Sequence, residues 1–227
     1  MTDSQGPGRT LAHFYLNGAG DAAGTLHPAE QHLLDCAATG EICIIGQDRP
    51  DEKTAGNLIR SPFLRFLALG DARALGDCFA AMPRATYRFY SPHPLDHEGG
   101  AAVAALALCP RSVALVAENA AHEIAGYAWY RWKAEDSRSS TFGICLHPDY
   151  RGIGLGQAMI ARLLEIAAHV GPPVMSLTVQ LANAGALALY RKMGFEVVRQ
   201  QVRGQVDEFA AEPEYYMEQP TRHSKAT

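Results

Sequence analysis

The sequence has no hydrophobic run long enough to cross a membrane. Its longest apolar stretch is "AAVAALALC", residues 101–109, whereas a membrane-spanning helix needs about 20 apolar residues. The first ten residues, "MTDSQGPGRT", contain no apolar segment of the kind that a secretory signal carries. These two absences predict a cytoplasmic protein without a membrane partner.

An excess of basic charge is also missing. The formal net charge is -4, and neither residues 1–75 nor residues 76–227 carry more basic than acidic side chains. Because nucleic acids and anionic lipids are bound through clustered Lys and Arg, we expect neither as a partner.

The five cysteines are scattered, with no C-x-x-C pair, and the nine histidines form no H-E-x-x-H or similar pattern. This spacing predicts reduced thiols, no disulfide framework and no metal. Cys145 lies between Ile144 and Leu146, so it is interpreted as a buried strand residue and not as a nucleophile.

The apolar fraction of 48% over 227 residues is enough for one sizeable core with a small unit appended. We predict an N-terminal extension over residues 1–76, ending at the doubled "LGD", a main domain over 77–219 and a flexible tail over 220–227. The extension reads as helix 28–40, strand 41–46 and helix 54–70, with Pro62 in the first turn of a new helix capped by Ser61. It could cover the core, form a homodimer or bind a partner.

The main domain has an α+β pattern of strands with interleaved helices. The expected strands are 112–118, 123–132, 140–146, 174–179 and the segments "FEVVRQQV" and "EYYMEQ". The expected helices begin near Gly152 and at Ala184, and they end before Gly171 and at Gly194.

Three glycines crowd the start of the first of these helices, at Gly152, Gly154 and Gly156. Each costs up to about 1 kcal/mol of helix propensity relative to alanine, so a compensating role is expected. Unpaired amides at residues 152–157, with Arg151 beside them, predict an anion site at the helix N-terminus. The alternative is a close crossing of helix on sheet that merely requires small residues.

Two common phosphate-binding loops do not fit this turn. A dinucleotide fold needs G-x-G-x-x-G directly after the strand and an acid at the end of the next strand. Here the third glycine is missing, five residues separate Leu146 from Gly152, and "VMSLTVQ" ends without an acid. The Gly-Lys-Ser/Thr sequence of a Walker A loop is absent as well.

The stretch "ICLHPDYRGIGLGQAMIARLLEIA" resembles the GNAT superfamily of N-acetyltransferases. The pyrophosphate-binding pattern of that superfamily, (Gln/Arg)-x-x-Gly-x-(Gly/Ala), is matched by Arg151, Gly154 and Gly156. A second stretch, "NAGALALYRKMGF", matches its Asn-x6-Tyr signature at Asn183 and Tyr190 and the Gly-Phe turn that follows. The two motifs stand in the family's order and spacing, and the resemblance covers roughly residues 78–219.

The resemblance implies a mixed, mostly antiparallel central sheet, flanked by helices, in which two neighbouring parallel strands splay apart. It also implies acetyl-CoA as the acyl donor, without a metal. The cofactor-binding positions it implies are Ile144, Cys145 and Leu146 for the pantetheine arm, Arg151, Gly152, Ile153, Gly154, Leu155, Gly156 and Gln157 for the pyrophosphate, and Asn183 for the pantetheine or the far end of the cofactor.

Tyr190 is implied as the catalytic residue, near the thioester sulfur. A thiol has a pKa of about 8.5 and a tyrosine about 10, so a tyrosine can protonate the sulfur as charge develops there. Most of the acceleration would come from aligning amine and thioester. The structural alternative for Tyr190 is an aromatic residue that only packs on the buried side of its helix.

The general base is open. Members of the superfamily often carry a glutamate at positions that here hold Thr141 and Thr178, and threonine is no base at neutral pH. Glu118, Glu123 and His147 remain as candidates, beside a chain of waters that carries the proton to bulk solvent.

The stretch "ATYRFYSPHPL", residues 85–95, resembles an "LYxRFFS" segment in a subgroup that includes protein lysine acetyltransferases. It makes Arg88, Tyr90, His93 and His97 candidate contacts of the acceptor, with a strand edge running into a proline turn as the alternative. The predicted function is acetyl transfer to a primary amine, either a small molecule or a protein lysine. The alternatives are a module that binds acyl-CoA without catalysis, and an acyl donor larger than acetyl.

Overall fold

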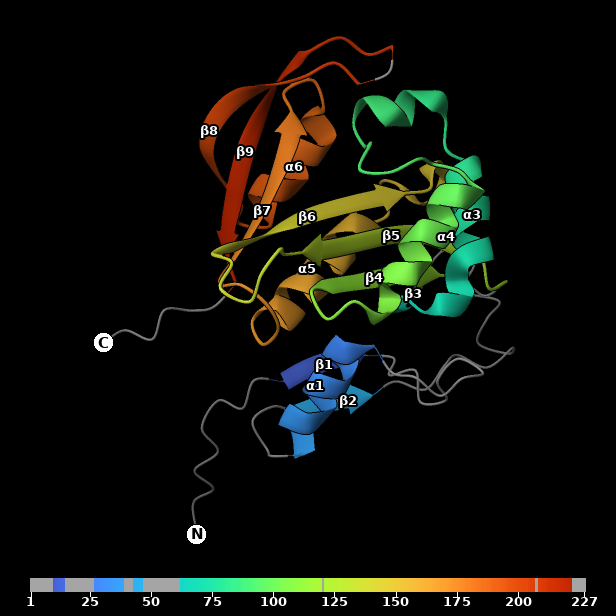
Figure 1. The fold of residues 1–227 in the computed structure, drawn as a ribbon, viewed down its shortest axis with the longest axis vertical. Coiled ribbons are helices and arrows are strands. Elements are labelled where there is room, and N and C mark those ends of the chain that lie inside the picture. The colour runs from blue at the N-terminus through green and yellow to red at the C-terminus, as the bar shows by residue number, and fades with distance from the viewer. Residues whose placement is uncertain are drawn as a thin grey trace.

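The computed structural model of the chain describes residues 10–14, 27–38, 43–46, 62–119, 121–206 and 208–221 (Figure 1). The strands are β1 Thr10–Phe14, β2 Cys43–Gly46, β3 Phe63–Phe66, β4 Ser112–Glu118, β5 Ile124–Arg131, β6 Ser139–Leu146, β7 Val174–Gln180, β8 Glu196–Arg203 and β9 Glu212–Pro220. The α-helices are α1 Pro28–Ala38, α3 Ala72–Ala80, α4 His97–Ala104, α5 Leu155–Ala167 and α6 Ala184–Lys192. Short 3-10 helices are η2 Leu69–Asp71, η3 Arg84–Arg88, η4 Ala105–Leu108 and η5 Pro148–Tyr150.

Seven strands form one twisted sheet in the order β3-β4-β5-β6-β7-β9-β8. Every neighbouring pair is antiparallel except β6 and β7, which run parallel. This is the α+β architecture expected from the sequence, a mostly antiparallel sheet with one parallel pair and flanking helices, and the prediction is confirmed.

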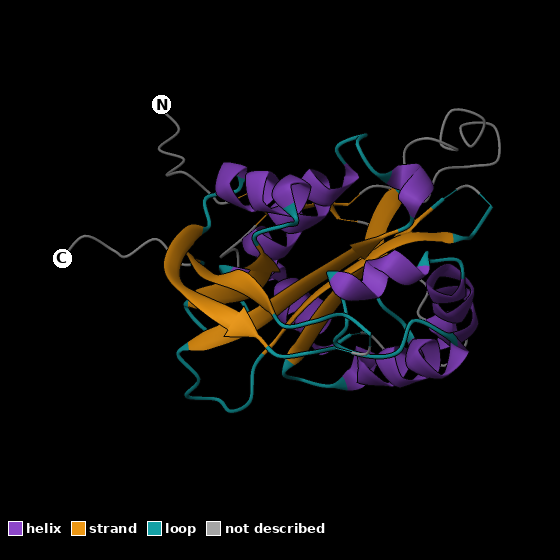
Figure 2. Cartoon of the chain, turned by 90° about the horizontal axis from the view of Figure 1, so that it is seen from above, coloured by secondary structure: helices purple, strands orange, loops and turns teal. Residues whose placement is uncertain are grey.

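Helices cover both faces of this sheet (Figure 2). Strand β4 is buried along its whole length, because alternate side chains point into two separate cores. Val113, Leu115 and Ala117 join the core that α5 fills with Met159, Ile160, Leu163 and Ile166. Ala114 and Val116 join the second core, which holds Leu75 and Phe79 of α3 and Val103 of α4. Apolar residues on both faces therefore fix the sheet between two helical layers.

The N-terminal elements match the prediction in part. Helix α1 and strand β2 lie where a helix and a strand were expected, and β2 pairs in parallel with β1, which was not predicted. Helix α1 buries Ala29, Leu33 and Cys36 in the core of the α5 face. Of the predicted flexible tail over 220–227, Pro220 ends β9 and Thr221 is buried, with its N–H donating to the Pro173 carbonyl at 2.9 Å. Residues 222–227 lie outside the described residues.

The predicted helix over 54–70 is wrong in its second half, where residues 63–66 form the edge strand β3. Phe63 pairs with Glu118 and Phe66 with Leu115 of β4. A short apolar run does not distinguish a strand from a buried helix by its periodicity, and Pro62, which has no N–H, is tolerated at the start of an edge strand. Residues 54–61 lie outside the described part of the chain. The domain boundary after residue 76 stays a prediction, although β3 precedes it and belongs to the large sheet.

Candidate active site

The parallel strands β6 and β7 pair only at their beginnings. The register joins Ser139 to Val174, Ser140 to Met175 and Thr141 to Ser176, and no pairing between them continues to the ends of these strands. Figure 1 shows the two strands diverging into a V from this point. Because β5 still pairs with β6, and β9 with β7, the V leaves one edge of each strand without a backbone partner.

Alternation along β6 decides which backbone groups face the open side of the V. The His147 N–H donates to the Ala125 carbonyl at 2.9 Å, so the odd-numbered residues of β6 exchange hydrogen bonds with β5. The N–H and C=O of Ile144 therefore point into the V, whereas those of Cys145 point towards β5. The Leu146 carbonyl also faces away from β5 and accepts a hydrogen bond from Arg151 Nε at 3.0 Å.

A turn built on two left-handed glycines leads from β6 into α5. Gly152 has φ 75° and Gly154, the N-cap of α5, has φ 89°, values that L-residues with a side chain rarely adopt. Among the described residues, no acceptor takes a hydrogen bond from the backbone N–H groups of residues 152–157. The first N–H to be bonded is that of Ala158, which donates to the Gly154 carbonyl at 3.0 Å. The predicted set of free amides at this helix N-terminus is therefore present.

The third glycine of the turn is there for packing. A Cβ added at Gly156 would lie 3.2 Å from Leu189 and 3.3 Å from Leu146, whereas one added at Gly152 or Gly154 would meet nothing within 4 Å. The close-crossing alternative thus accounts for Gly156, which lets α5 approach α6 and β6. It does not account for Gly152 and Gly154, whose surroundings are open.

Tyr190 lies on the buried side of α6, on the face of the sheet that α5 covers. Its ring makes edge contacts with Phe142 of β6 at 6.1 Å and with Phe195 at 5.9 Å between centroids. Burial, the largest cause, raises the pKa of the Tyr190 phenol above its usual range, and the nearby Cys145 thiol raises it further. The raised pKa keeps this phenol protonated at neutral pH. Its hydroxyl makes no hydrogen bond to a described residue, so the O–H is available to a ligand.

Asn183 has a structural role as the N-cap of α6. Its side-chain oxygen accepts a hydrogen bond from the Ala186 N–H at 3.3 Å, which satisfies one of the free amides at the start of this helix. The second motif therefore positions Tyr190 through the helix that Asn183 begins. Whether Asn183 also contacts a cofactor stays a prediction.

The candidate bases lie away from the V. Glu118 ends β4, two strands from the open edge of β6, and it pairs with Arg65 and, at 2.6 Å, with His122. Glu123, between β4 and β5, accepts from the Asn119 side chain at 2.8 Å. His147 Nδ1 accepts from the Asp149 N–H at 3.3 Å and so shapes the turn. Thr141 and Thr178 are exposed.

The segment 84–97 is not a strand edge but a 3-10 helix followed by a proline-rich loop. Tyr90 is buried, where its hydroxyl accepts from Trp129 Nε1 at 2.9 Å and lies 3.4 Å from His93 Nε2. Arg88 donates to Glu212 of β9, and His97 is exposed 3.8 Å from Asp77. The four predicted acceptor residues thus lie in one segment, but they do not form a single cluster of side chains.

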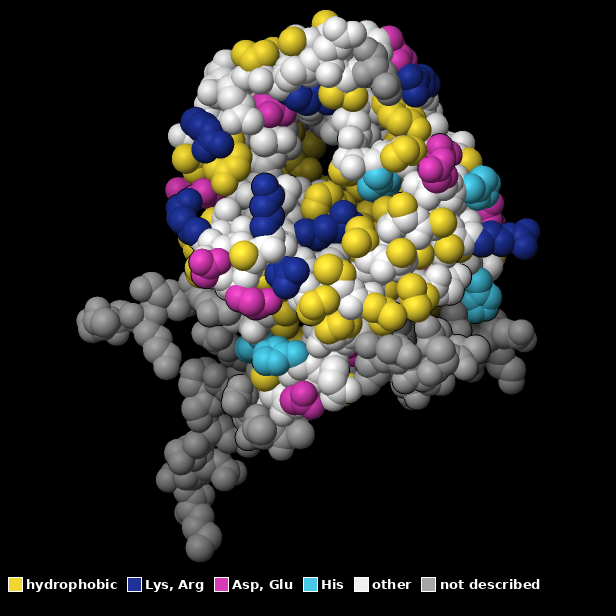
Figure 3. All heavy atoms as spheres, viewed as in Figure 1, with side chains coloured by type: hydrophobic (Ala, Val, Ile, Leu, Met, Phe, Trp, Pro, Cys, Tyr) yellow, Lys and Arg dark blue, Asp and Glu magenta, His cyan; other side chains and the backbone are white. Residues whose placement is uncertain are grey.

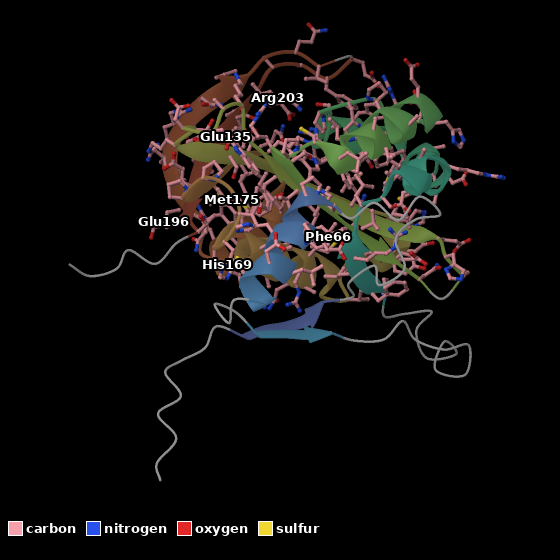
Figure 4. All side chains as sticks on the ribbon, turned by 60° about the horizontal axis from the view of Figure 1, so that its bottom comes forward. Phe66, Glu135, His169, Met175, Glu196 and Arg203 are labelled. Atoms are coloured by element: carbon pink, nitrogen blue, oxygen red, sulfur yellow. The ribbon has the colours of Figure 1, made fainter. Side chains whose placement is uncertain are left out.

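The sequence analysis did not identify a group of polar side chains where β7 and β8 end and β9 begins. We call Gln180, Arg203, Glu212 and Glu214 the rim cluster. Gln180 pairs in register with Glu214, and Arg203 with Glu212, which places all four side chains on one face of the sheet. The space-filling view shows an opening beneath the β8–β9 hairpin tip, and Figure 4 marks Arg203 in that hairpin. No motif signals these residues, because cross-strand register brings them together.

A family model described as the acetyltransferase (GNAT) family matches residues 80–195, which is just over half of the chain. The chain belongs to this family. The match spans the β6–α5 turn and Tyr190, the two features that carried the resemblance.

Relatives of this GNAT protein with known names are acyltransferases. It is 36% identical over 86 residues to the L-methionine sulfoximine/L-methionine sulfone acetyltransferase of Pseudomonas aeruginosa PAO1, which is 37% of this chain and 50% of that protein. It is 27% identical over 141 residues to the L-amino acid N-acyltransferase MnaT of Escherichia coli K12, which is 60% of this chain and 81% of the relative. The chain thus spans about half the length of the first of these relatives.

Solved structures share the GNAT fold. A phosphinothricin acetyltransferase from Sinorhizobium meliloti in complex with acetyl-CoA superposes with a TM-score of 0.59 at 19% identity, covering 74% of this chain and 92% of that one. The spermidine N-acetyltransferase of Vibrio cholerae with CoA and spermine gives 0.59 at 20% identity, covering 70% and 94%. In the described ranges, no helix is long and apolar enough for a membrane crossing, and no cluster of three or more His, Cys, Asp or Glu could hold a metal ion.

Proposed function

We propose that this GNAT protein transfers an acetyl group from acetyl-CoA to a primary amine by direct attack. One observation carries the proposal. The free N–H groups of residues 152–157 stand at the positive end of α5, beside a V between β6 and β7 whose inner edge is unpaired. A diphosphate fits the first feature, and an amide-containing arm that can pair like a strand fits the second. Coenzyme A carries both groups.

The chain's own residues supply three contributions to the reaction. The amides of the turn, with Arg151, would hold the pyrophosphate, and the backbone of Ile144 would pair with the pantetheine. The donor supplies an activated acyl group as a thioester. The neutral amine attacks the thioester carbonyl, the new C–N bond forms as the C–S bond breaks, and the departing thiolate takes a proton from the Tyr190 hydroxyl. The proton that the amine loses passes through water to bulk solvent, from which the Tyr190 phenolate is protonated again. Holding both reactants in place would supply most of the rate enhancement.

The relatives support an amine acceptor. Those named above act on amino acids and their analogues, and the neighbour from Vibrio cholerae acts on spermidine. A small-molecule amine is therefore the proposed acceptor, with a protein lysine as a second possibility that only the segment 85–95 favours. A cytoplasmic location and a homodimer stay predictions.

A thiol-release assay tests the proposal. Purified protein, acetyl-CoA and a panel of amino acids, polyamines and lysine peptides are incubated, and free coenzyme A is measured. We expect release that depends on one class of amine, together with a thermal shift by CoA that NAD does not produce. CoA binding without release for every amine would instead identify a module that binds acyl-CoA and does not catalyse.

A further inference from the structure

The rim cluster contains three buried polar atoms that have no partner in the described residues. They are one terminal nitrogen of Arg203, Nη2, and one carboxylate oxygen, Oε2, of each of Glu212 and Glu214. Glu214 is 4% exposed, and only its other oxygen is bonded, to the Gln201 amide at 2.8 Å. Unpaired buried groups of this kind are costly, so a partner that completes them, either water or a bound ligand, is expected.

The other contacts of the cluster hold these atoms in place. With its carbonyl oxygen turned to Arg203, Gln180 accepts from Nε at 3.3 Å and from Nη1 at 2.9 Å. Both bonds of Arg88 go to Oε1 of Glu212, which leaves Oε2 free. The hydrogen bond from Arg88, then the charge of Arg88 and last the charge of Arg203 lower the pKa of Glu212, so that this carboxylate is ionised at neutral pH.

The cluster stands where an acceptor would enter. Gln180 is the last residue of β7, at the wide end of the V, and its side chain lies on the sheet face opposite to the α5 core. The ion pairs Arg84–Glu208 and Arg88–Glu212 tie the hairpin to η3 above the opening seen in Figure 3. Figures 1 and 3 share one view, in which the opening lies near the ends of β6 and β7, where the V is widest.

We propose that the rim cluster is the ionic subsite of the acceptor and that the acceptor is an amine that also carries a carboxylate, as an α-amino acid does. Glu214 Oε2 receives hydrogen bonds from the ammonium group, and Arg203 Nη2 donates one to the carboxylate. This inference rests on the proposed function and names the class of its second substrate.

The charge balance of the cluster favours such a zwitterion over a polyamine. Arg88 and Arg203 balance Glu212 and Glu214, so an acceptor without net charge leaves the site neutral. A polyamine could complete only the two carboxylates, would leave Arg203 Nη2 unpaired and would bring further positive charge beside two guanidinium groups.

The test compares each amino acid that is acetylated with its own carboxamide, which keeps the amine and the side chain and removes only the negative charge. In the wild-type protein, the KM for the amino acid is expected to be roughly tenfold to a hundredfold lower than the KM for its carboxamide. A hydrogen bond between charged groups contributes a difference of this size. Arg203→Gln should raise the KM for the acid by that factor and leave the KM for the carboxamide within about twofold. The KM of Arg203→Lys for the amino acid should lie between those of the wild type and Arg203→Gln.

Arg138→Gln is the matched control, because it removes an exposed guanidinium that pairs with Glu218 of the same strand β9. It should change neither KM, and all variants should keep the thermal shift produced by CoA. Equal KM values for acid and carboxamide in the wild type, or an equal effect of Arg203→Gln on both, would overturn the inference, as would a preference for spermidine. In each of these outcomes acetyl transfer still occurs, so the proposed function stands. Absence of transfer to any amine would overturn the function itself.

Calorimetric titration of L-methionine sulfone into the CoA-saturated protein tests the subsite without turnover. Binding that Glu214→Gln weakens by tenfold or more supports it, with the exposed Glu196→Gln on β8 as control. Binding that is unchanged in Glu214→Gln and Arg203→Gln contradicts it.

Discussion

The three glycines of the β6–α5 turn have two different roles. Gly152 and Gly154 adopt left-handed conformations in open surroundings, whereas Gly156 is small so that α5 can pack closely. The motif alone presents all three as one phosphate-binding set. The difference follows from backbone torsion and from the positions of Leu146 and Leu189, neither of which can be seen in the sequence.

Gly154→Glu is predicted to weaken CoA binding by more than about tenfold, because it places a carboxylate among amides that would hold a diphosphate. Gly154→Ala introduces the same left-handed strain, of about 1–2 kcal/mol, without the charge. Titration of both variants with CoA separates the two effects. Equal affinities in the two variants would mean that no anion lies at this turn.

Tyr190→Phe is predicted to lower kcat for acetyl transfer by roughly a hundredfold and to leave the Kd for CoA nearly unchanged, since general-acid contributions are of this size. The phenylalanine ring keeps the contacts with Phe142 and Phe195, so the fold should not suffer. The control is Tyr130→Phe in the same core, whose hydroxyl bonds the Val170 carbonyl and should affect stability instead of turnover. Equal kcat for wild type and Tyr190→Phe would restrict Tyr190 to packing.

Among the secondary-structure elements, strand β3 is one whose type the local sequence pattern does not determine. "FLRF" fits a helix or a strand equally well, and the deciding contacts are remote in the sequence. Arg65 lies between Asp71, at 2.7 and 2.8 Å, and Glu118 of β4. The elements from β4 to α6 were predictable because their alternation, their glycines and their two motifs are local signals.

Arg65→Met is predicted to reduce the free energy of unfolding by about 3–5 kcal/mol, because it removes the guanidinium that lies between two buried carboxylates. The side chains of Asp71 and Glu118 are only 9% and 2% exposed. Arg138→Met breaks an ion pair whose arginine is 73% exposed and should cost less than about 1 kcal/mol. Urea unfolding of both variants gives the comparison, and a similar small loss in each would show that β3 does not depend on this network.

At the scale of the whole molecule, α1 is docked onto the sheet. His27 stacks on Phe66 at 5.0 Å between ring centroids and caps α1 by accepting from the Ala29 N–H at 3.1 Å. Figure 4 shows Phe66 beside this helix. The sequence predicted α1 but not where it packs, because the apolar side of a helix indicates burial without indicating which surface it packs against.

The docking of α1 is predicted to make stability depend on pH. Burial lowers the pKa of His27 from 6.5 to about 4, so between these values the unfolded chain binds a proton that the folded protein does not. The free energy of unfolding should therefore fall as the pH drops through this window, by up to about 3 kcal/mol from this residue. His27→Asn, which can still cap α1, should remove that part of the fall.

Urea unfolding at pH 7 and at pH 4.5 measures this effect. The wild type should lose more stability between the two values than His27→Asn does, whereas His32→Asn, which removes an exposed imidazole from the same helix, should behave like the wild type. A constant difference between His27→Asn and wild type at both pH values would contradict the burial of a neutral His27.

The proposed function depends most directly on the backbone N–H groups of residues 152–157 binding the diphosphate of coenzyme A. NMR titration observes these amides directly, with CoA in one series and pantetheine, which lacks the diphosphate, in the other. If these amides hold the diphosphate, the Gly152, Gly154 and Gly156 amide signals shift strongly with CoA and little with pantetheine. Amide signals that stay in place with saturating CoA, or that move equally with pantetheine, would contradict it.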